Sequence, residues 1–431
     1  MSVETKVNYW IQDAYERGAS DIHFEPDKND KMRVRMRVDG MLRTVETSPD
    51  SRKILSRLKV MAELDVNEKV IPQDGRINFE KHAGTCAGLD LRMSTLPCMD
   101  GEKVVLRLID NRKLGMQMDE LGFSKRMQAC YEPLVNSPNG LVLHVGPTGS
   151  GKTTSLYAVL QTLKKKEINI QTAEDPVEYN MFGVTQTAVN HELGLTFPKV
   201  LRALLRQDPD VILVGEIRDS ETADIALEAA MTGHLVLSTL HTNDAVGTVV
   251  RLLDMGIAPF CIAYSLRCVV SQRFVRRLCE KCRRATQPPP RVAQVTGSNK
   301  PIHQAVGCGS CGKSGYRGRI PLFEFMPNSG QLKKAVYGSV TPDGLAQVAA
   351  QSGLISLWDD GLEKVWRGQT SLEEVLRVVK GVRSSKASAK AKAQASAQSK
   401  TKPRAETGPG AGTSAGTGGR SRGPQGSAGR R

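Results

Sequence analysis

The chain has 431 residues, 39% of them hydrophobic, so it is long enough for two or three domains and a large core. No stretch approaches the roughly 18 consecutive apolar residues that span a bilayer. Residues 1–6 do not lead into the apolar segment of a signal peptide, so a cytoplasmic location is expected. The net charge of +15 is concentrated in residues 381–431, where eleven Lys/Arg accompany one acid, and this makes it a weak sign of a nucleic-acid partner.

Residues 1–113 combine helical and strand-like patterns. A short amphipathic helix is predicted over residues 6–17. A strand over 31–38 follows, with a turn at Asp39-Gly40 and a second strand beginning at 41–42. The remaining predicted elements are a helix over 51–64 and strands over 89–94 and 103–109. The pattern predicts a small α+β domain over 1–113 and a linker over 114–123.

Residues 124–380 alternate apolar strands with helices, as expected for a parallel sheet covered on both faces. The predicted strands are 141–145, 168–172, 211–214 and 235–238, with helices that include 198–206 and 220–231. A Cys-, Pro- and Gly-rich insert at about 276–318 precedes a helical end over 331–379. The fold class is therefore α/β. Residues 381–431 contain almost no large apolar side chains and are expected to be disordered.

Residues 146–153 match the phosphate-binding pattern G-x-x-x-x-G-K-[ST] between a predicted strand and a predicted helix. In such a P-loop, backbone N–H groups and the helix N-terminus surround a phosphate. Lys152 would reach the β- and γ-phosphates, and the Thr153 hydroxyl would bind Mg²⁺. The alternative is a chance Gly-rich turn, but both flanks fit a site for a nucleoside triphosphate. The residues expected at the nucleotide are Gly146, Pro147, Thr148, Gly149, Ser150, Gly151, Lys152, Thr153 and Thr154.

Two acidic groups follow predicted strands of the same domain. Glu174, Asp175 and Glu178 lie within five residues, and such crowding is costly unless a cation or a water relay uses the carboxylates. The alternative is a solvated acidic turn. The apolar strand 211–214 leads to Glu216, as a Walker B strand leads to its acid, although that acid is usually Asp. Glu216 is predicted to hold Mg²⁺, and Glu174 to lie at the nucleotide.

Two histidines, His234 and His241, bracket the predicted strand 235–238. Beside a P-loop they are candidates for sensing the γ-phosphate, whereas a lone histidine near a sheet is usually structural. His23 and His144 are interpreted as structural residues on that ground.

Four of the nine cysteines form two C-x-x-C pairs. Such pairs place thiolates on tight turns, and two of them complete a tetrahedral site for Zn²⁺. A structural zinc ion is predicted, the alternatives being a redox pair or unliganded thiols. The predicted ligands are Cys279, Cys282, Cys308 and Cys311, and the scattered Cys86, Cys98, Cys130, Cys261 and Cys268 are interpreted as ordinary core or surface residues.

The order of these motifs resembles the type II secretion and type IV pilus assembly ATPases. The resemblance covers about residues 18–380 and includes Gly18–Pro26, Arg35–Gly40 and Pro72–Arg76 upstream of the P-loop. It implies a cytoplasmic homo-hexamer at the inner membrane, in which an N-terminal domain and a RecA-like motor domain pivot during hydrolysis of ATP with Mg²⁺. The implied partners are a membrane-embedded platform protein and a membrane recruitment protein.

The resemblance also implies roles for individual residues. Glu178 would polarise the attacking water and Glu216 would hold Mg²⁺, while Arg92 and Arg107 match arginines that contact the phosphates. A guanidinium group suits that task because it neutralises charge on a transferring phosphoryl group. The alternative for both arginines is an exposed position on a strand. A tetracysteine insert favours an assembly or secretion member over a retraction member, and the separate leading domain of many members is not expected in this chain.

Three classes of function remain after this reading. A motor ATPase for secretion or pilus assembly is favoured. A nucleic-acid motor for DNA uptake or conjugation is the alternative, since a fold alone does not fix function, but few aromatic residues are available for base stacking. A nucleotide-binding scaffold without turnover would be expected to have a damaged site. The basic tail is interpreted first as a solubilising end and second as a contact for an acidic partner, rather than as a ligand for lipid or nucleic acid.

Overall fold

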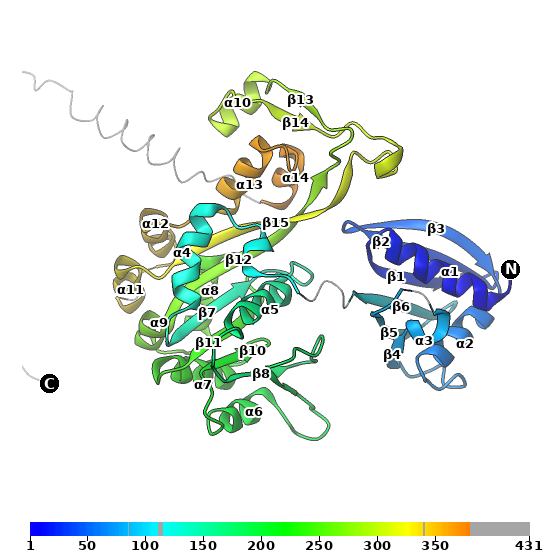
Figure 1. Cartoon of the computed structure of the whole chain (residues 1–431), viewed down its shortest axis with the longest axis horizontal. Helices are drawn as coiled ribbons and strands as arrows, with labels where there is room; N and C mark the ends of the chain where they lie inside the picture. Colours follow the sequence, from blue (N-terminus) through cyan, green and yellow to red (C-terminus); the bar gives the residue numbers. More distant parts are fainter. Residues whose placement is uncertain (85, 111–114, 339–340, 380–431) are drawn as a thin grey trace, which may run out of the picture. The chain divides into compact units, whose positions relative to one another are not determined.

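The computed structural model describes residues 1–84, 86–110, 115–338 and 341–379, all within one unit, Met1–Ser385. The expected disorder of the tail therefore lies outside the described residues. Figure 1 labels the elements in chain order. In the described ranges, no helix is both long and apolar enough to cross a membrane.

Residues 1–110 form an antiparallel sheet with helices on one face. The strands are β1 (Ala19–Pro26), β2 (Lys31–Val38), β3 (Met41–Pro49), β4 (Asp74–Asn78), β5 (Leu89–Cys98) and β6 (Gly101–Asp110), in the spatial order β3-β2-β1-β6-β5-β4. The helices are α1 (Val3–Glu16), α2 (Ser51–Met61) and α3 (Glu80–Ala83). Alternation along β5 buries Leu91 and Met93 in one core with Trp10 of α1 and Leu58 of α2, and leaves Arg92 on the opposite face.

The second part contains a seven-stranded sheet in the order β15-β12-β7-β11-β10-β8-β9. Six of the strands are parallel, and β15 pairs antiparallel with β12. Its strands are β7 (Gly140–Val145), β8 (Ile170–Glu174), β9 (Thr185–Ala188), β10 (Val211–Val214), β11 (Leu235–Leu240), β12 (Leu266–Leu278) and β15 (Tyr316–Pro327). Each residue of β7, β8, β10 and β11 is buried, because helices cover both faces of the sheet.

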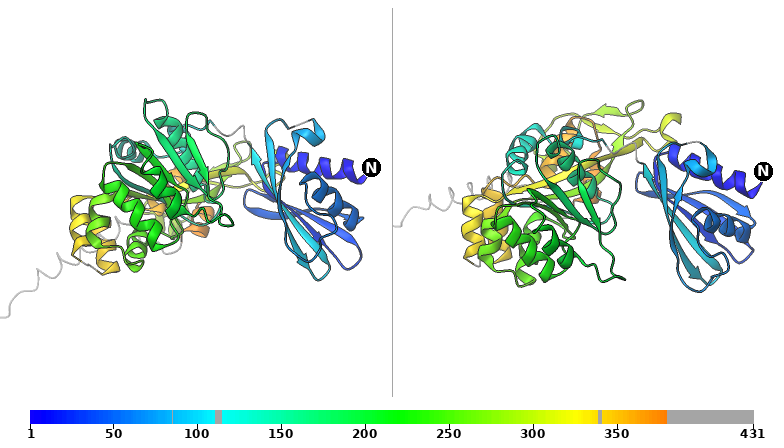
Figure 2. Two further views of the ribbon diagram at one scale, coloured as in Figure 1. Left: turned by 90° about the horizontal axis from the view of Figure 1, so that it is seen from below. Right: turned by 60° about the horizontal axis from the view of Figure 1, so that its bottom comes forward.

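Helices cover both faces of this sheet (Figures 1 and 2), and an apolar core lies on each side of it. One contains side chains of α6 (Phe197–Leu204), α7 (Ser220–Met231), α8 (Ala245–Asp254) and α9 (Pro259–Ser265). The other contains side chains of α4 (Lys125–Val135) and α5 (Lys152–Leu163). Met118 and Leu121 of a 3₁₀ helix, η2 (Met118–Leu121), are buried in this second core, so part of the segment predicted as a linker packs on the motor sheet.

The long pair β12 and β15 carries the insert between its strands. The insert contains β13 (Arg284–Thr286), α10 (Pro290–Thr296), β14 (Ile302–Gln304) and a 3₁₀ helix, η3 (Gly309–Cys311). The predicted helical end is confirmed as α11 (Gly330–Tyr337), α12 (Pro342–Gln351), α13 (Leu357–Trp366) and α14 (Leu372–Val378). The α/β class is thus confirmed. The strands that the sequence patterns did not predict are β1, β4, β9, β12, β13, β14 and β15.

Candidate functional site

The P-loop pattern occupies the predicted turn between β7 and α5. Gly149 and Gly151 have φ values of +75° and +89°, a left-handed conformation that favours glycine. A Cβ at Gly151 would also lie 2.8 Å from Cζ of Phe274, so the position requires glycine for space as well. Residues 147–149 are exposed. The loop is therefore open to a ligand, with the N-terminus of α5 directed at it.

Lys152 is held over this loop. Its Nζ donates hydrogen bonds to the carbonyl oxygens of Gly146, at 2.9 Å, and Pro147, at 3.3 Å. Burial lowers the pKa of Lys152, and the nearby Glu216 carboxylate opposes that shift. Thr153 and Thr154 are exposed in the first turn of α5. An ammonium group, two hydroxyls and the loop N–H groups could together bind a polyphosphate and its cation.

Glu216 and His241 follow neighbouring strands at the carboxyl edge of the sheet, the edge to which the P-loop also belongs. The parallel pairing of β10, β11 and β7 brings these strand ends together. Glu216 is largely buried and forms an ion pair with Arg218, and its Oε2 lies 3.3 Å from Nε2 of His241. A carboxylate held by an arginine and a histidine beside Lys152 could accept a hydrated Mg²⁺ ion.

The acidic run after β8 divides in the structure. The Asp175 carboxylate lies 3.6 Å from Nε2 of His191 and 4.0 Å from the Arg218 guanidinium group, and both Asp175 and Glu178 are accessible. Glu174 is only 3% exposed and accepts hydrogen bonds from neutral side chains. The carboxylate of Glu174 therefore lies inside the fold, and its place among the nucleotide-binding residues stays a prediction.

Arg92 and Arg107 are direct cross-strand partners on β5 and β6. Both lie on the sheet face away from α1 and α2. The Nε atom of Arg107 lies 3.1 Å from Oδ1 of Asp21, and Nη2 of Arg92 lies 3.0 Å from Oε2 of Glu178. Like charges on directly opposed residues repel each other, so this pair of arginines is suited to an anionic ligand.

The two candidate histidines and the two that are interpreted as structural have different environments. His234 precedes β11 at the amino edge of the sheet, where its Nδ1 lies 3.0 Å from the Ala229 carbonyl oxygen. His234 therefore lies at the opposite edge of the sheet from His241, and its role beside the γ-phosphate stays a prediction. His144 is fully buried, which lowers its pKa to about 3, and its Nε2 lies 2.7 Å from Oη of Tyr131. Burial also lowers the pKa of His23. Both fit the predicted structural role.

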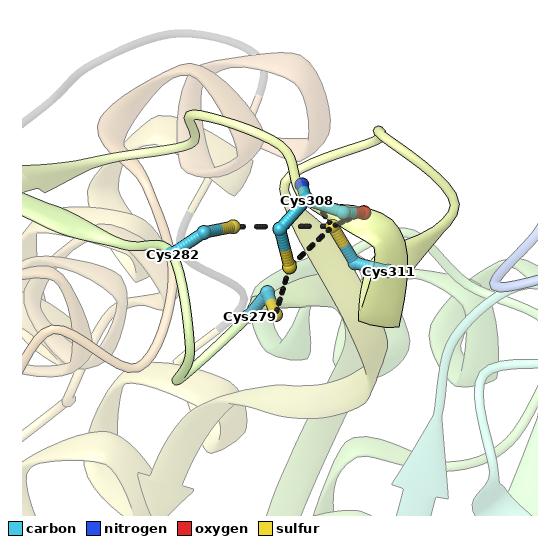
Figure 3. Close-up of side chains that lie close together, drawn as sticks. All are labelled: Cys279, Cys282, Cys308 and Cys311. Atoms are coloured by element: carbon cyan, nitrogen blue, oxygen red, sulfur yellow. Dashed lines mark hydrogen bonds between the residues drawn. The ribbon is translucent and has the colours of Figure 1, made fainter.

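The two C-x-x-C pairs converge, as Figure 3 shows. All four Sγ atoms lie within 4.8 Å of one another, with separations of 3.9 Å for Cys279–Cys308, 3.9 Å for Cys282–Cys311 and 3.8 Å for Cys308–Cys311. Zn–S bonds of about 2.3 Å in a tetrahedron place sulfur atoms about 3.8 Å apart. The cluster therefore fits zinc, and four protein ligands leave no position for a substrate.

Three residues of β12 that the sequence patterns did not indicate support the P-loop. Gln272 accepts a hydrogen bond from Ser155 at 2.8 Å, and the Phe274 ring packs against the position of Gly151. Arg273 is close enough to lower the pKa of Lys152, and burial lowers its own pKa. No sequence signal identified them, since β12 was not predicted as a strand next to β7.

The fold and site are those of a P-loop nucleotide-binding protein with an additional N-terminal domain. The defining features are the strand–P-loop–helix unit, Glu216 after β10 and the parallel sheet. Residues 1–377 match the family model described as type II/IV secretion system protein. The chain belongs to that family.

Two curated relatives illustrate the match. The type IV pilus assembly ATPase PilB of Myxococcus xanthus is 45% identical over 384 residues, which is 86% of this chain and 66% of that protein. The type II secretion system protein E of Pseudomonas aeruginosa is 46% identical over 380 residues, which is 87% of this chain and 75% of that protein. The chain thus spans about two thirds of the length of the first relative.

Solved structures support the fold. The crystal structure of the pilus retraction motor PilT with bound ADP gives a TM-score of 0.58 at 23% identity and covers 87% of this chain and 97% of that one. The Legionella pneumophila ATPase DotB gives a TM-score of 0.64 at 19% identity and covers 85% of this chain and 93% of that one.

Proposed function

We propose that this protein is a motor ATPase that hydrolyses Mg²⁺-bound ATP to drive type II protein secretion or type IV pilus assembly. The observation that carries the proposal is the placement of Lys152 over an open P-loop beside the Glu216–His241 pair. Positive and negative groups that meet in this way are suited to cation-assisted phosphoryl transfer. The names of the relatives point to the same activity.

Within this proposal each side chain has a task that its position permits. Lys152 binds the β- and γ-phosphate oxygens, while Thr153 and Glu216 hold Mg²⁺, the latter through water. Glu178 polarises the attacking water. His241 senses the γ-phosphate and is in contact with Glu216. Arg92 and Arg107 neutralise charge on the transferred group, which is the task that arginine performs well in phosphoryl transfer.

A pocket beside the P-loop is suited to the nucleoside. It has a volume of about 440 Å³, and its lining includes Phe123, Gly151, Thr154 and Phe274. Phe123 and Phe274 provide aromatic surfaces for a planar base, and polar and charged side chains that include Glu120, Arg319, Lys364 and Arg367 form much of the remaining lining. The lining comes entirely from the part of the chain that contains the seven-stranded sheet, between Met116 and Gln369.

The proposal extends to assembly and partners. A homo-hexamer at the cytoplasmic face of the inner membrane, working with a platform protein and a membrane recruitment protein, is the expected arrangement. The names of the relatives support the process, type IV pilus assembly or type II secretion, in which such an arrangement would work. No observation favours the alternative of a nucleic-acid motor for DNA uptake or conjugation.

The test is ATP turnover by the purified full chain. Lys152→Ala should abolish hydrolysis and leave the circular dichroism spectrum and Tm close to those of the wild type, because its side chain holds phosphate and not the core. The candidate platform protein should stimulate turnover, whereas DNA should not. Full turnover by Lys152→Ala would overturn the site assignment, and stimulation by DNA alone would overturn the assigned process.

A further inference from the structure

Glu174 is a buried carboxylate that the proposed reaction does not use. Its Oε1 accepts hydrogen bonds from Oγ1 of Thr172, at 2.6 Å, and from Nε2 of Gln186, at 3.1 Å. Its Oε2 accepts a hydrogen bond from the Tyr157 hydroxyl group. Among the described residues no cationic side chain forms an ion pair with Glu174. Burial of a carboxylate among neutral partners costs folding free energy, because the group loses its hydration without gaining an opposite charge. We therefore looked for a function of Glu174 at this position.

The partners of Glu174 come from three separate elements. Tyr157 lies on α5, five residues after Lys152, and is 1% exposed. Gln186 lies on β9, directly beside Thr172 of β8 in the parallel register. One carboxylate therefore connects the helix that follows the P-loop with the two outer strands of the sheet.

The same side chains hold the loop that carries Glu178. The Gln186 side chain accepts a hydrogen bond from Met181 N at 2.7 Å and donates one to the Tyr179 carbonyl oxygen at 3.1 Å. Burial and the Glu174 carboxylate raise the pKa of Tyr157, and a hydrogen bond from the Glu178 backbone acts in the opposite direction. The loop is thus bound to the network on both sides of residue 180, while Asp175 and Glu178 remain accessible.

We propose that Tyr157, Glu174 and Gln186 are positioning residues that fix the loop bearing Glu178 relative to the P-loop helix. The proposal rests on the proposed ATP hydrolysis and adds residues that do not touch the nucleotide. A water-polarising carboxylate must stay within a fraction of an ångström of its working position, because small displacements of a catalytic group cost large factors in rate. Bonds from α5 to this loop keep Glu178 in register with Lys152.

Removal of the Tyr157 hydroxyl group tests the positioning of the Glu178 loop separately from the binding of ATP. Tyr157→Phe keeps the ring and breaks the bond to Glu174, so kcat should fall roughly tenfold or more while the Kd for ATP with Mg²⁺ changes less than about threefold. Tyr179→Phe is the matched control. Its ring packs edge-on against Tyr157 with the centroids 4.6 Å apart, and it should keep the wild-type kcat. Equal kcat values for the two variants would overturn the proposal.

Glu174 itself distinguishes positioning from direct nucleotide binding. Glu174→Gln keeps an oxygen for Thr172 and Gln186, and its amide can donate to the Tyr157 hydroxyl. It should retain most of the turnover that Glu174→Ala loses. If both variants lost turnover equally and both needed more Mg²⁺ for half-maximal nucleotide binding, Glu174 would be a ligand of the nucleotide complex and the proposal would be wrong.

A measurement without turnover keeps this inference separate from the proposed function. Hydrogen exchange of amides 175–184 should be faster in Tyr157→Phe and Glu174→Ala than in Tyr179→Phe and Glu174→Gln, at equal Tm. A wild-type protein that did not hydrolyse ATP would refute the proposed function alone. Unchanged exchange in all four variants would refute the network alone.

Discussion

The Nε2 atom of His241 lies 3.3 Å from the Oε2 atom of Glu216, and this contact joins the ends of two neighbouring parallel strands. Glu216 is also paired with Arg218, so its carboxylate lies between an arginine and a histidine. His234 lies at the other end of β11, where its Nδ1 contacts the carbonyl oxygen of Ala229 in α7 and not Glu216 or Arg218. The two histidines of this segment therefore differ in what a substitution should do.

His241→Ala should reduce the rate of ATP hydrolysis by roughly tenfold to a hundredfold, because Glu216 loses the partner that orients it towards the cation. ATP binding, measured by titration of a fluorescent analogue, should weaken less than about threefold. His234→Asn is the matched control at the opposite sheet edge and should hydrolyse ATP at nearly the wild-type rate. A larger loss of rate in His234→Asn than in His241→Ala would contradict this assignment.

Arg218 should compete with Mg²⁺ for Glu216. Its guanidinium group pairs with that carboxylate and lies 4.0 Å from Asp175, and its side chain is 60% exposed. Arg218→Ala should lower the Mg²⁺ concentration for half-maximal nucleotide binding by about threefold to tenfold, since one positive charge leaves the cation site. Arg218→Lys keeps the charge and should behave like the wild type in the same Mg²⁺ titration. A higher Mg²⁺ requirement in Arg218→Ala would show that the arginine assists the cation.

The protein should contain about one zinc ion per chain by elemental analysis. Cys308→Ser should lose it, and residues 279–315 should become sensitive to protease, because metal binding supplies about 10 kcal/mol or more of folding free energy in small zinc domains. Cys98→Ser replaces an exposed cysteine outside the cluster and should keep the zinc. Full zinc content in Cys308→Ser would exclude the four-cysteine site.

The P-loop and the apolar strands of the motor sheet were predictable because their signals are local. Glycines, lysine and threonine at fixed spacing require a particular backbone, and continuous apolar runs such as 211–214 indicate strands covered on both faces. The four cysteines were predictable for the same reason. Each C-x-x-C pair is a turn of its own, and only the meeting of the two pairs depends on the fold.

The strands β12 and β15 were not predictable from apolar periodicity. Arg273, Arg276 and Arg319 interrupt their apolar positions, because these arginines have partners elsewhere in the fold. Arg276 pairs with Glu374, which is 98 residues away. Such partners cannot be read from the local sequence, and the residues that support the P-loop from β12 were missed for that reason.

The sequence did not indicate which way the side chains of the acidic run point, or at which edge of the sheet each of the two histidines lies. A strand covered on both faces buries every side chain, so alternation could not indicate that Glu174 faces inward. His234 and His241 are seven residues apart on a strand that rises about 3.3 Å per residue, which separates them by about 23 Å. That separation places the two histidines at opposite edges of the sheet, but it can be stated only once the segment between them is known to be a strand.

Glu324 should make the stability of the protein depend on pH. Burial raises its pKa to about 7, with Asp244 acting in the same direction and Arg273 and a hydrogen bond from Ala245 N opposing it. Between about pH 4.5, the value in the unfolded chain, and pH 7, the native state binds more protons at this site than the unfolded state. The free energy of unfolding should therefore fall as the pH rises through that window, by up to about 3 kcal/mol.

Glu324→Gln should remove this dependence, since the amide is neutral at every pH and its oxygen can still accept the hydrogen bond from Ala245 N. Urea unfolding at several pH values between 4.5 and 7.5 measures the effect as the difference in slope between variant and wild type. Glu228→Gln replaces an exposed carboxylate of α7 and should keep the wild-type slope. A common slope for Glu324→Gln and the wild type would mean that Arg273 keeps Glu324 ionised throughout. The carboxylate would then be a permanent counter-charge beside the P-loop and would not take up a proton on folding.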